Sequence, residues 1–349
     1  MGLSERMNPA ARILVVGPSW VGDMVMASVL FQLLRARQPH ARIDVLAPGW
    51  SLPLLARMPE VDQGLEMPVG HGRLGLRVRW RLARSLRGRY DQAIVLPGSL
   101  KSTLVPWLAG IARRTGYRGE QRYGLLNDMR QLRPVELPLM VQRYAALALD
   151  VRTPLAADLP AELPRPRLRV DAGRQAALLA EFGLDLQRPA VALLPGAEFG
   201  PSKQWPLDYF AEVARALLAQ GYAVWVLGSA RDAEAGRSIA GQAPGTRDLC
   251  GCTRLEDAVD LLAATSGCIS NDSGLMHVAA ALDVPLVALF GSTSPEHTPP
   301  LSDRAQVLRL GLDCSPCFQR NCPLGHHRCL REIRPAQVLA ALTPALATA

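Results

Sequence analysis

The sequence predicts an α/β protein built from two Rossmann-like domains that face each other across a cleft. Three observations support this prediction: the chain has 349 residues, short apolar runs alternate with longer amphipathic stretches, and a strand–turn–helix pattern opens each half. A chain of this length exceeds what one hydrophobic core accommodates, so two domains are expected. Ligands of such folds bind at the carboxyl ends of the parallel strands.

The first half opens on an apolar strand at 12–16 that runs into a turn and then a helix. The turn is similar to a dinucleotide-binding turn, yet it has only Gly17 and Gly22 in place of the G-x-G-x-x-G pattern. A carboxylate, Asp23, stands at the mouth of the helix, where it would repel a pyrophosphate. The turn therefore favours a reacting group over a cofactor phosphate, although Asp23 also fits an ordinary N-cap.

Further strands are expected at four short apolar runs: residues 41–46, 92–96, 223–227 and 286–290. Residues 153–189 are rich in Pro and Ala and have one short helical stretch at 171–182, so we expect the interdomain linker there. The predicted domains are an N-terminal one over residues 1–165 and a C-terminal one over residues 186–349.

The second half begins with a strand at 191–194 and a loop at 195–206 that is rich in Gly and Pro. Small residues let backbone amides approach a ligand, and the one lysine of the loop, Lys203, supplies a compact positive charge suited to phosphate. A solvated loop lysine without a ligand is the alternative.

A strand that runs through a polar turn directly into an apolar helix is predicted at 269–282. The free N–H groups and the positive dipole end of such a helix suit an anion such as a diphosphate. Taken alone, Asp272 or Ser273 also fits an ordinary N-cap. Together with Lys203, this turn predicts a nucleotide site in the second half.

The formal net charge is +8, and arginines are concentrated in the first half. Such a surface favours an anionic partner, such as an acidic membrane surface or an acidic glycolipid. Nucleic acid is disfavoured, because aromatic residues make up only 5% of the sequence and no nucleic-acid-binding motif accompanies the arginines. For residues 73–89, arginines that only keep a helix face soluble are the alternative. No secretory signal or apolar span is visible, so we expect a cytoplasmic protein.

The sequence has seven cysteines, and without a signal peptide disulfides are not expected. Four of them follow a C-x2-C-x4-C-x6-C spacing that fits no standard zinc pair well: Cys314, Cys317, Cys322 and Cys329. We expect no metal and reduced loop cysteines here, with a structural metal site as the alternative.

Three segments together resemble the ADP-heptose:lipopolysaccharide heptosyltransferases of glycosyltransferase family 9: residues 17–24, 195–206 and 271–281. The resemblance runs from about Arg12 to about Ser302, and it stops before the cysteine segment, which the best-known enterobacterial members lack. It implies a GT-B fold with an N-terminal acceptor domain and a C-terminal nucleotide-sugar domain. It also implies an inverting, metal-independent glycosyltransferase without a cofactor.

The resemblance assigns roles to the matching positions. Asp23 would be the general base that takes the proton of the acceptor hydroxyl, and Lys203 with the amides of the helix start would stabilise the departing ADP. The implied nucleotide-sugar residues are Ala197, Glu198, Lys203, Asp232, Thr253, Asp272, Ser273, Gly274 and His277. The implied acceptor residues are Gly22, Lys101, Arg114, Arg118 and Arg122.

The implied reaction moves L-glycero-D-manno-heptose from ADP-heptose to heptosyl-Kdo2-lipid A, during assembly of the lipopolysaccharide inner core. The enzyme would then work at the inner face of the inner membrane, touch it transiently, and bind no nucleic acid. Alternatives within the fold are heptosyltransferase I or III, or a GT-B enzyme with another nucleotide-sugar donor. A Rossmann oxidoreductase or nucleotide-binding regulator and an RNA-binding protein are alternatives from other classes.

Overall fold

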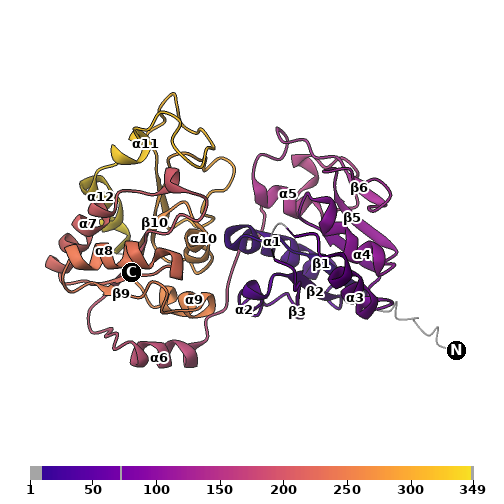
Figure 1. Cartoon of the computed structure of the whole chain (residues 1–349), viewed down its shortest axis with the longest axis horizontal. Helices are drawn as coiled ribbons and strands as arrows, with labels where there is room; N and C mark the ends of the chain where they lie inside the picture. Colours follow the sequence, from indigo (N-terminus) through magenta and orange to yellow (C-terminus); the bar gives the residue numbers. More distant parts are fainter. Residues whose placement is uncertain (1–9, 71–72, 347–349) are drawn as a thin grey trace. The chain divides into compact units, whose positions relative to one another are not determined.

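The structure is a computed structural model that describes residues 10–70 and 73–346. Its contacts divide the chain into two compact units, and Figure 1 colours the chain from indigo to yellow along the sequence. The first unit holds the chain up to Ser19 and from Met26 to Pro164, and the second holds Trp20–Val25 and the chain from Arg165 onward. The division after Pro164 lies inside the Pro- and Ala-rich segment 153–189.

The first unit contains a sheet of six parallel strands in the spatial order β3-β2-β1-β4-β5-β6. The strands are β1 Arg12–Val16, β2 Arg42–Ala47, β3 Gln63–Glu66, β4 Gln92–Val95, β5 Arg113–Tyr117 and β6 Asp128–Arg130. The chain builds the sheet outward from β1 in one direction and from β4 in the other. Rossmann-type sheets bind ligands at such a switch point, beyond the carboxyl ends of the strands.

Helices connect these strands. They are α1 Val21–Arg37, α2 Leu52–Leu55, α3 Leu76–Leu86, α4 Leu104–Leu108 and α5 Met140–Ala146, with short 3-10 turns η1 Gly49–Ser51, η2 Leu100–Thr103 and η3 Ala156–Asp158. The connection from β1 is short, so α1 begins close to the carboxyl end of the strand, at the switch point. The sequence thereby places the first turn of α1 where a ligand is expected.

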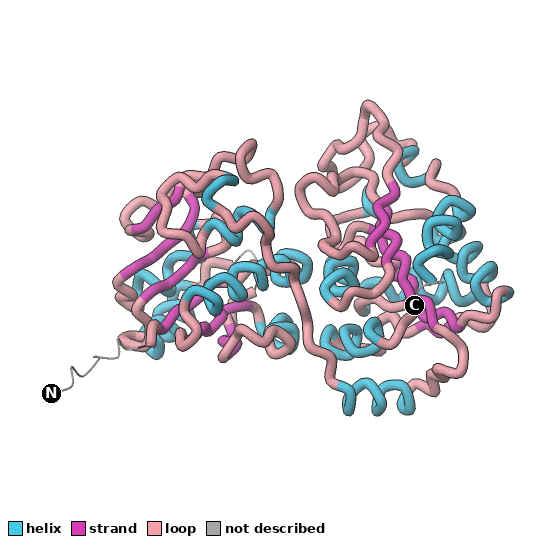
Figure 2. The backbone as a smooth tube through the Cα atoms, turned by 180° about the vertical axis from the view of Figure 1, so that it is seen from behind, coloured by secondary structure: helices cyan, strands magenta, loops and turns pink. Residues whose placement is uncertain are grey.

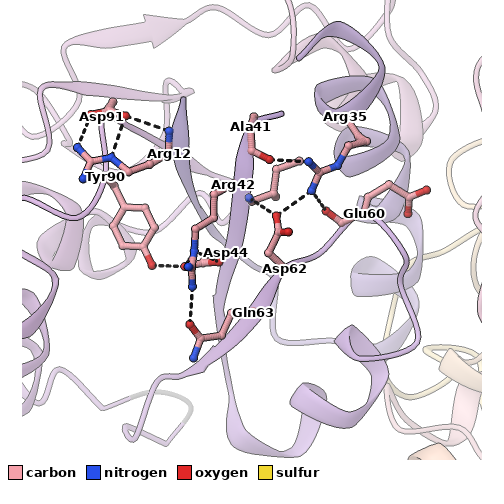
Figure 3. A network of polar contacts seen from close by, with 11 residues as sticks. Arg12, Arg35, Ala41, Arg42, Asp44, Glu60, Asp62, Gln63, Tyr90 and Asp91 are labelled. Carbon is pink, nitrogen blue, oxygen red and sulfur yellow. Dashed lines mark hydrogen bonds and ion pairs between the residues drawn. The ribbon is translucent and has the colours of Figure 1, made fainter. Parts of the chain in front are cut away.

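Figure 3 shows a network of polar contacts where β1, β2 and β3 begin, at the amino ends of the strands and opposite to the switch point. Arg12 forms an ion pair with Asp91 at 2.7 Å, and Arg42 forms one with Asp44 at 3.0 Å. Asp44 is fully buried and accepts the hydroxyl of Tyr90 at 2.6 Å. Burial and this carboxylate raise the pKa of Tyr90, so the phenol stays protonated. These contacts stabilise the strand starts and leave the carboxyl edge for function.

The second unit repeats the same topology in a sheet of six parallel strands, in the order β12-β11-β10-β7-β8-β9. The strands are β7 Ala190–Leu194, β8 Ala223–Val226, β9 Arg247–Asp248, β10 Gly267–Asn271, β11 Leu286–Leu289 and β12 Ala305–Leu308. The switch point of this sheet lies between β7 and β10. These are the two strands whose following loops predict phosphate binding.

Helices of the second unit are α6 Ala172–Glu181, α7 Leu207–Ala219, α8 Ala233–Gln242, α9 Leu255–Ala263, α10 Gly274–Ala281, α11 Arg328–Arg331 and α12 Pro335–Leu346. Two 3-10 turns, η4 Pro201–Lys203 and η5 Ala230–Asp232, precede α7 and α8. On α7, Phe210, Val213 and Leu217 are buried at helical spacing, so one face of the helix packs on the core. Trp205 just before it is fully buried, with its ring centroid 4.9 Å from that of Phe210.

Figure 2 shows strands flanked by helices within each unit. The strands are mostly apolar and buried along their length, as in β7 and β11, which is typical of parallel sheets covered on both faces. The predicted α/β class with two Rossmann-like sheets is confirmed. The runs at 41–46, 92–96, 223–227 and 286–290 are strands within one residue at each end.

Candidate active site

The candidate site of the second unit lies at the carboxyl ends of β7 and β10. Asn271, the last residue of β10, is fully buried and ties the two following loops together. Its side-chain amide donates to the carbonyl of Pro195 at 2.8 Å, and its side-chain oxygen accepts the backbone N–H of Trp205 at 3.1 Å. Asn271 therefore fixes both ends of the 195–206 loop against the start of α10.

Lys203 and Asp272 form the electrostatic centre of this site. Lys203 Nζ lies 2.6 Å from Asp272 Oδ2, and the side chains are only 14% and 5% exposed. The hydroxyl of Thr293 also donates to Asp272 Oδ2, and Lys203 Nζ lies 5.2 Å from the centroid of the Phe199 ring. These contacts hold the ammonium group in one place, which is what stabilisation of a developing charge requires.

Helix α10 supplies the second positive element. It begins at Gly274, and Ser273 before it has the extended backbone of an N-cap residue without a side-chain capping hydrogen bond. The first N–H groups of a helix have no partner within the helix. With Lys203 held by Asp272 at the same strand end, the two features together form a place for an anion.

His277 lies one turn into α10 and is 6% exposed. Burial lowers its pKa to about 4; the charge of Asp272 opposes this shift and that of Lys203 adds to it. The imidazole is therefore neutral at pH 7. A neutral imidazole has one hydrogen-bond donor and one acceptor to offer beside the paired charges.

The shifted pKa of His277 predicts how stability depends on pH. Because the folded-state pKa lies below the unfolded value of about 6.5, unfolding takes up a proton between these values. The contribution of neutral His277 to the free energy of unfolding is fully present above pH 6.5. Up to about 3 kcal/mol of it is lost as the pH falls toward 4. Urea unfolding at pH 7 and pH 5 checks this. His277→Gln should flatten the dependence, while the exposed control His40→Gln should not; equal slopes in both variants would refute the assignment.

The remaining predicted nucleotide-sugar residues lie around this centre or farther along the same edge. Ala197 and Glu198 are in the loop after β7, where Glu198 forms an exposed ion pair with Arg231. Asp232 ends η5 and accepts the backbone N–H and the hydroxyl of Ser229, each at 2.8 Å. Thr253 is half-buried in the loop before α9. Asp232 and Thr253 therefore come from the loops after β8 and β9.

The predicted base lies directly after β1, at the switch point of the first sheet, in a turn (Trp20–Val25) whose contacts assign it to the second unit. Gly22 and Asp23 lie in the first turn of α1, directly after the turn that follows β1. Asp23 is half-buried. An acid at this position is also favoured by the helix dipole, so the geometry alone fits both a base and a stabilising acid.

The four basic acceptor candidates fall into two pairs. The Arg114 guanidinium donates to the carbonyls of Ile111 and Leu125, and Arg122, 1% exposed, donates to those of Pro97 and Tyr117. Both therefore brace the loops after β4 and β5, and burial lowers the pKa of each. In contrast, Lys101 in η2 is half-buried and Arg118 is exposed, stacked on the Tyr123 ring at 5.8 Å. All four remain candidates for acceptor contact, and Arg118 is the one whose side chain is exposed.

Comparison with known proteins identifies the family. The model of glycosyltransferase family 9 (heptosyltransferase) matches residues 79–328. The chain belongs to this family. Lipopolysaccharide heptosyltransferase 2 of Salmonella typhimurium is 51% identical over 95% of this chain and 97% of its own length. Lipooligosaccharide heptosyltransferase 2 of Haemophilus influenzae is 47% identical over 96% of this chain and 99% of its own.

A solved structure is equally similar. The ADP-heptose lps heptosyltransferase II of E. coli superposes with a TM-score of 0.87 at 48% identity, over 97% of this chain and 99% of that one. The family 9 chain is therefore an α/β glycosyltransferase of the GT-B type. Ligands of open α/β sheets bind at such switch points, so the two described above are the candidate sites.

Several supporting residues of this family 9 enzyme were missed by the sequence analysis. Phe199 and Asn271 lie in the segments 195–206 and 271–281, and Thr293 lies outside them. The sequence predicts no role for any of the three. For Asn271 a signal existed, because an amide at the end of an apolar strand needs buried partners. For Thr293 none existed, since only the sheet order brings the loop after β11 beside the end of β10.

Proposed function

We propose that this chain transfers L-glycero-D-manno-heptose from ADP-heptose to a heptosylated Kdo2–lipid A acceptor, with inversion at the anomeric carbon. The observation that carries the proposal is the Lys203–Asp272 pair at the start of α10, a preorganised place for a sugar diphosphate. The close relatives named heptosyltransferase 2 support the choice of sugar and acceptor.

In the proposed mechanism, the acceptor hydroxyl oxygen attacks the anomeric carbon while the bond from that carbon to the β-phosphate oxygen breaks. The electron pair of the broken bond leaves on ADP, and the hydroxyl proton passes to the carboxylate of Asp23. Displacement from the side opposite the leaving group inverts the anomeric carbon, as two-carboxylate inverting glycosidases do with water.

ADP leaves as an anion, so its stabilisation is the other half of the reaction. Lys203 and the N–H groups of Ser273 and Gly274 supply positive charge at fixed positions. Asp272 accepts hydrogen bonds only, which suits hydroxyl groups of the sugar better than phosphate. This set of groups can balance the diphosphate charge without a metal ion in the reaction.

The experiment is ADP release from ADP-heptose by purified protein in EDTA, with heptosyl-Kdo2-lipid A, with Kdo2-lipid A, or with neither. We expect release with the heptosylated acceptor alone. Release with Kdo2-lipid A instead would assign the transfer of the first heptose. No release with either acceptor would refute the proposed donor, and loss of activity in EDTA that added Mg²⁺ or Mn²⁺ restores would refute the metal-independent mechanism.

We also propose that α3 contacts the acidic membrane surface that carries the acceptor. Residues 67–90 contain seven arginines and no Asp or Glu. Leu76 and Trp80 on α3 are 55% and 52% exposed, so apolar and cationic side chains share one surface. Among the described residues, no helix is long and apolar enough to span a bilayer. Contact through α3 would therefore be peripheral.

Co-sedimentation with vesicles of phosphatidylglycerol and phosphatidylethanolamine checks this contact. Replacing both Arg77 and Arg81 by Glu should weaken binding at least about tenfold, since each basic residue near an anionic surface contributes about 1 kcal/mol. The matched control replaces Arg215 and Arg237, two exposed arginines of the second unit, by Glu. Equal loss in both variants would leave only a general charge effect.

A further inference from the structure

The segment from Arg309 to His327, between β12 and α11, is the longest part of the second unit without helix or strand. None of its residues is buried, so it has no apolar core of its own. A long irregular segment in a compact domain needs other contacts to offset its conformational entropy. This segment and the first residues of α11 carry four of the seven cysteines.

All four cysteines line one small cavity of about 20 Å³. A space of this size holds one water molecule or one ion. The cavity wall also includes Ser202 and Ser292 from neighbouring loops and the imidazoles of His326 and His327. Nδ1 of His326 already accepts the backbone N–H of Arg328 at 3.0 Å, so the thiols are the better ligand set.

The backbone around Cys322 favours a negatively charged sulfur. Backbone N–H groups of residues 324–327 point to the sulfur of this residue. Cys329 lies within electrostatic range of Cys322, Cys314 and Cys317, so four thiolates here would repel one another. A divalent cation among the sulfurs would remove that repulsion.

We propose that this cavity is a structural metal site in which four thiolates hold one thiophilic divalent cation, Zn²⁺ or Fe²⁺: Cys314, Cys317, Cys322 and Cys329. Four sulfur ligands in tetrahedral arrangement select these ions. In the described part of the chain no three Cys, His, Asp or Glu side chains already stand in ligating geometry. Binding therefore turns the sulfurs inward, by rotation about their χ1 bonds.

The metal-binding segment is connected directly to the loop that carries Lys203. The backbone N–H of Ser202 donates to the carbonyl of Arg320 at 3.2 Å, and its hydroxyl donates to the carbonyl of Gln319. A Cβ at Gly200 would lie 2.6 Å from the same Arg320 carbonyl oxygen, so the two loops touch backbone to backbone. Order in the cysteine segment thus extends to the residue next to Lys203.

The segment also supports the loop of Thr293. The backbone N–H of Phe318 donates to the carbonyl of Ser292 at 2.7 Å, and the hydroxyl of Ser315 donates to the carbonyl of Gly291. Both partners of Asp272, Lys203 and Thr293, therefore lie next to residues held by this segment. The metal would stiffen the donor site from outside and take no part in the transfer itself.

The first experiment measures metal content of the untagged full chain, purified without added metal, by mass spectrometry of the elements. We expect about one equivalent of zinc or iron per chain, and the element found identifies the ion. Cys317→Ser and Cys322→Ser should each lose it, and the control Cys252→Ser, an exposed thiol elsewhere in the unit, should retain it. Less than about a tenth of an equivalent in the unaltered chain, even after anaerobic loading with Zn²⁺, would overturn the proposal.

Two further readouts distinguish a metal site from a segment held by disulfides. Loading the metal-free chain with Co²⁺ should produce sulfur-to-metal charge-transfer absorption that Cys317→Ser lacks. Disulfides among the four cysteines, found by mass spectrometry under anaerobic purification, would contradict the site. The consequence for donor binding rests on the proposed function: Cys317→Ser should raise the KM for ADP-heptose several-fold with little change in kcat. Metal content and cobalt spectra test the site even if that substrate is wrong.

Discussion

Replacement of Asp23 by Asn should lower kcat by a factor on the order of 10² to 10⁴ and leave ADP affinity nearly unchanged, as expected for loss of a general base. Asn keeps the size and polarity of the side chain but cannot take the acceptor proton. Asp23 lies in the first turn of α1, which the contacts assign to the second unit, whereas the anion site there consists of Lys203, Asp272 and the start of α10. The donor should therefore still bind.

The competing interpretation is that Asp23 only stabilises the start of α1. An acid in the first turn contributes about 0.3–1 kcal/mol through the helix dipole, so Asp23→Asn would then cost stability and leave kcat intact. Asp208, an exposed acid in the first turn of α7, provides the matched control. Asp208→Asn should reproduce any dipole effect on stability without a kinetic effect. Near-normal turnover of Asp23→Asn would remove it from the mechanism.

Much of the fold could be predicted because parallel sheets leave a strong pattern. Strands such as β7 and β11 are short, apolar throughout and bounded by turn residues, and their length and flanking residues identify them. The position of Lys203 and Asp272 at the same edge of one sheet was also predictable. Both follow strands, and the carboxyl ends of parallel strands share one edge.

The partners of the site could not be predicted, because they depend on sheet order and on side-chain direction. The sequence does not reveal that Thr293 lies beside Asp272, nor that the Arg320 carbonyl holds Ser202. For Arg114 and Arg122, residue type suggested ligand contact, whereas the structure turns both guanidinium groups to backbone carbonyls. An arginine in a turn-rich segment fits both uses equally well until its neighbours are known.

Replacement of Lys203 by Met should raise the KM for ADP-heptose and lower kcat by about 10², the usual effect of losing one preorganised group that stabilises developing charge. Met retains most of the apolar stem beside Phe199 and removes the ammonium. Steady-state kinetics with varied donor, together with calorimetric titration of ADP, measure both effects. Unchanged rate and unchanged affinity would reduce Lys203 to a structural residue.

Removal of this ammonium also leaves Asp272 as a buried carboxylate without its ion-pair partner, which typically costs about 3–5 kcal/mol. The double variant Lys203→Met with Asp272→Asn separates the two roles, because it removes the uncompensated charge. We expect it to regain most of the stability but none of the activity.

Lys101 is the only other lysine of the sequence and lies in the first unit, so Lys101→Met is the control for loss of one ammonium group. Since Lys101 is an acceptor candidate, that variant should leave ADP affinity intact and alter at most the KM for the acceptor. Recovery of activity in the double variant would instead show that Lys203 serves only to neutralise Asp272.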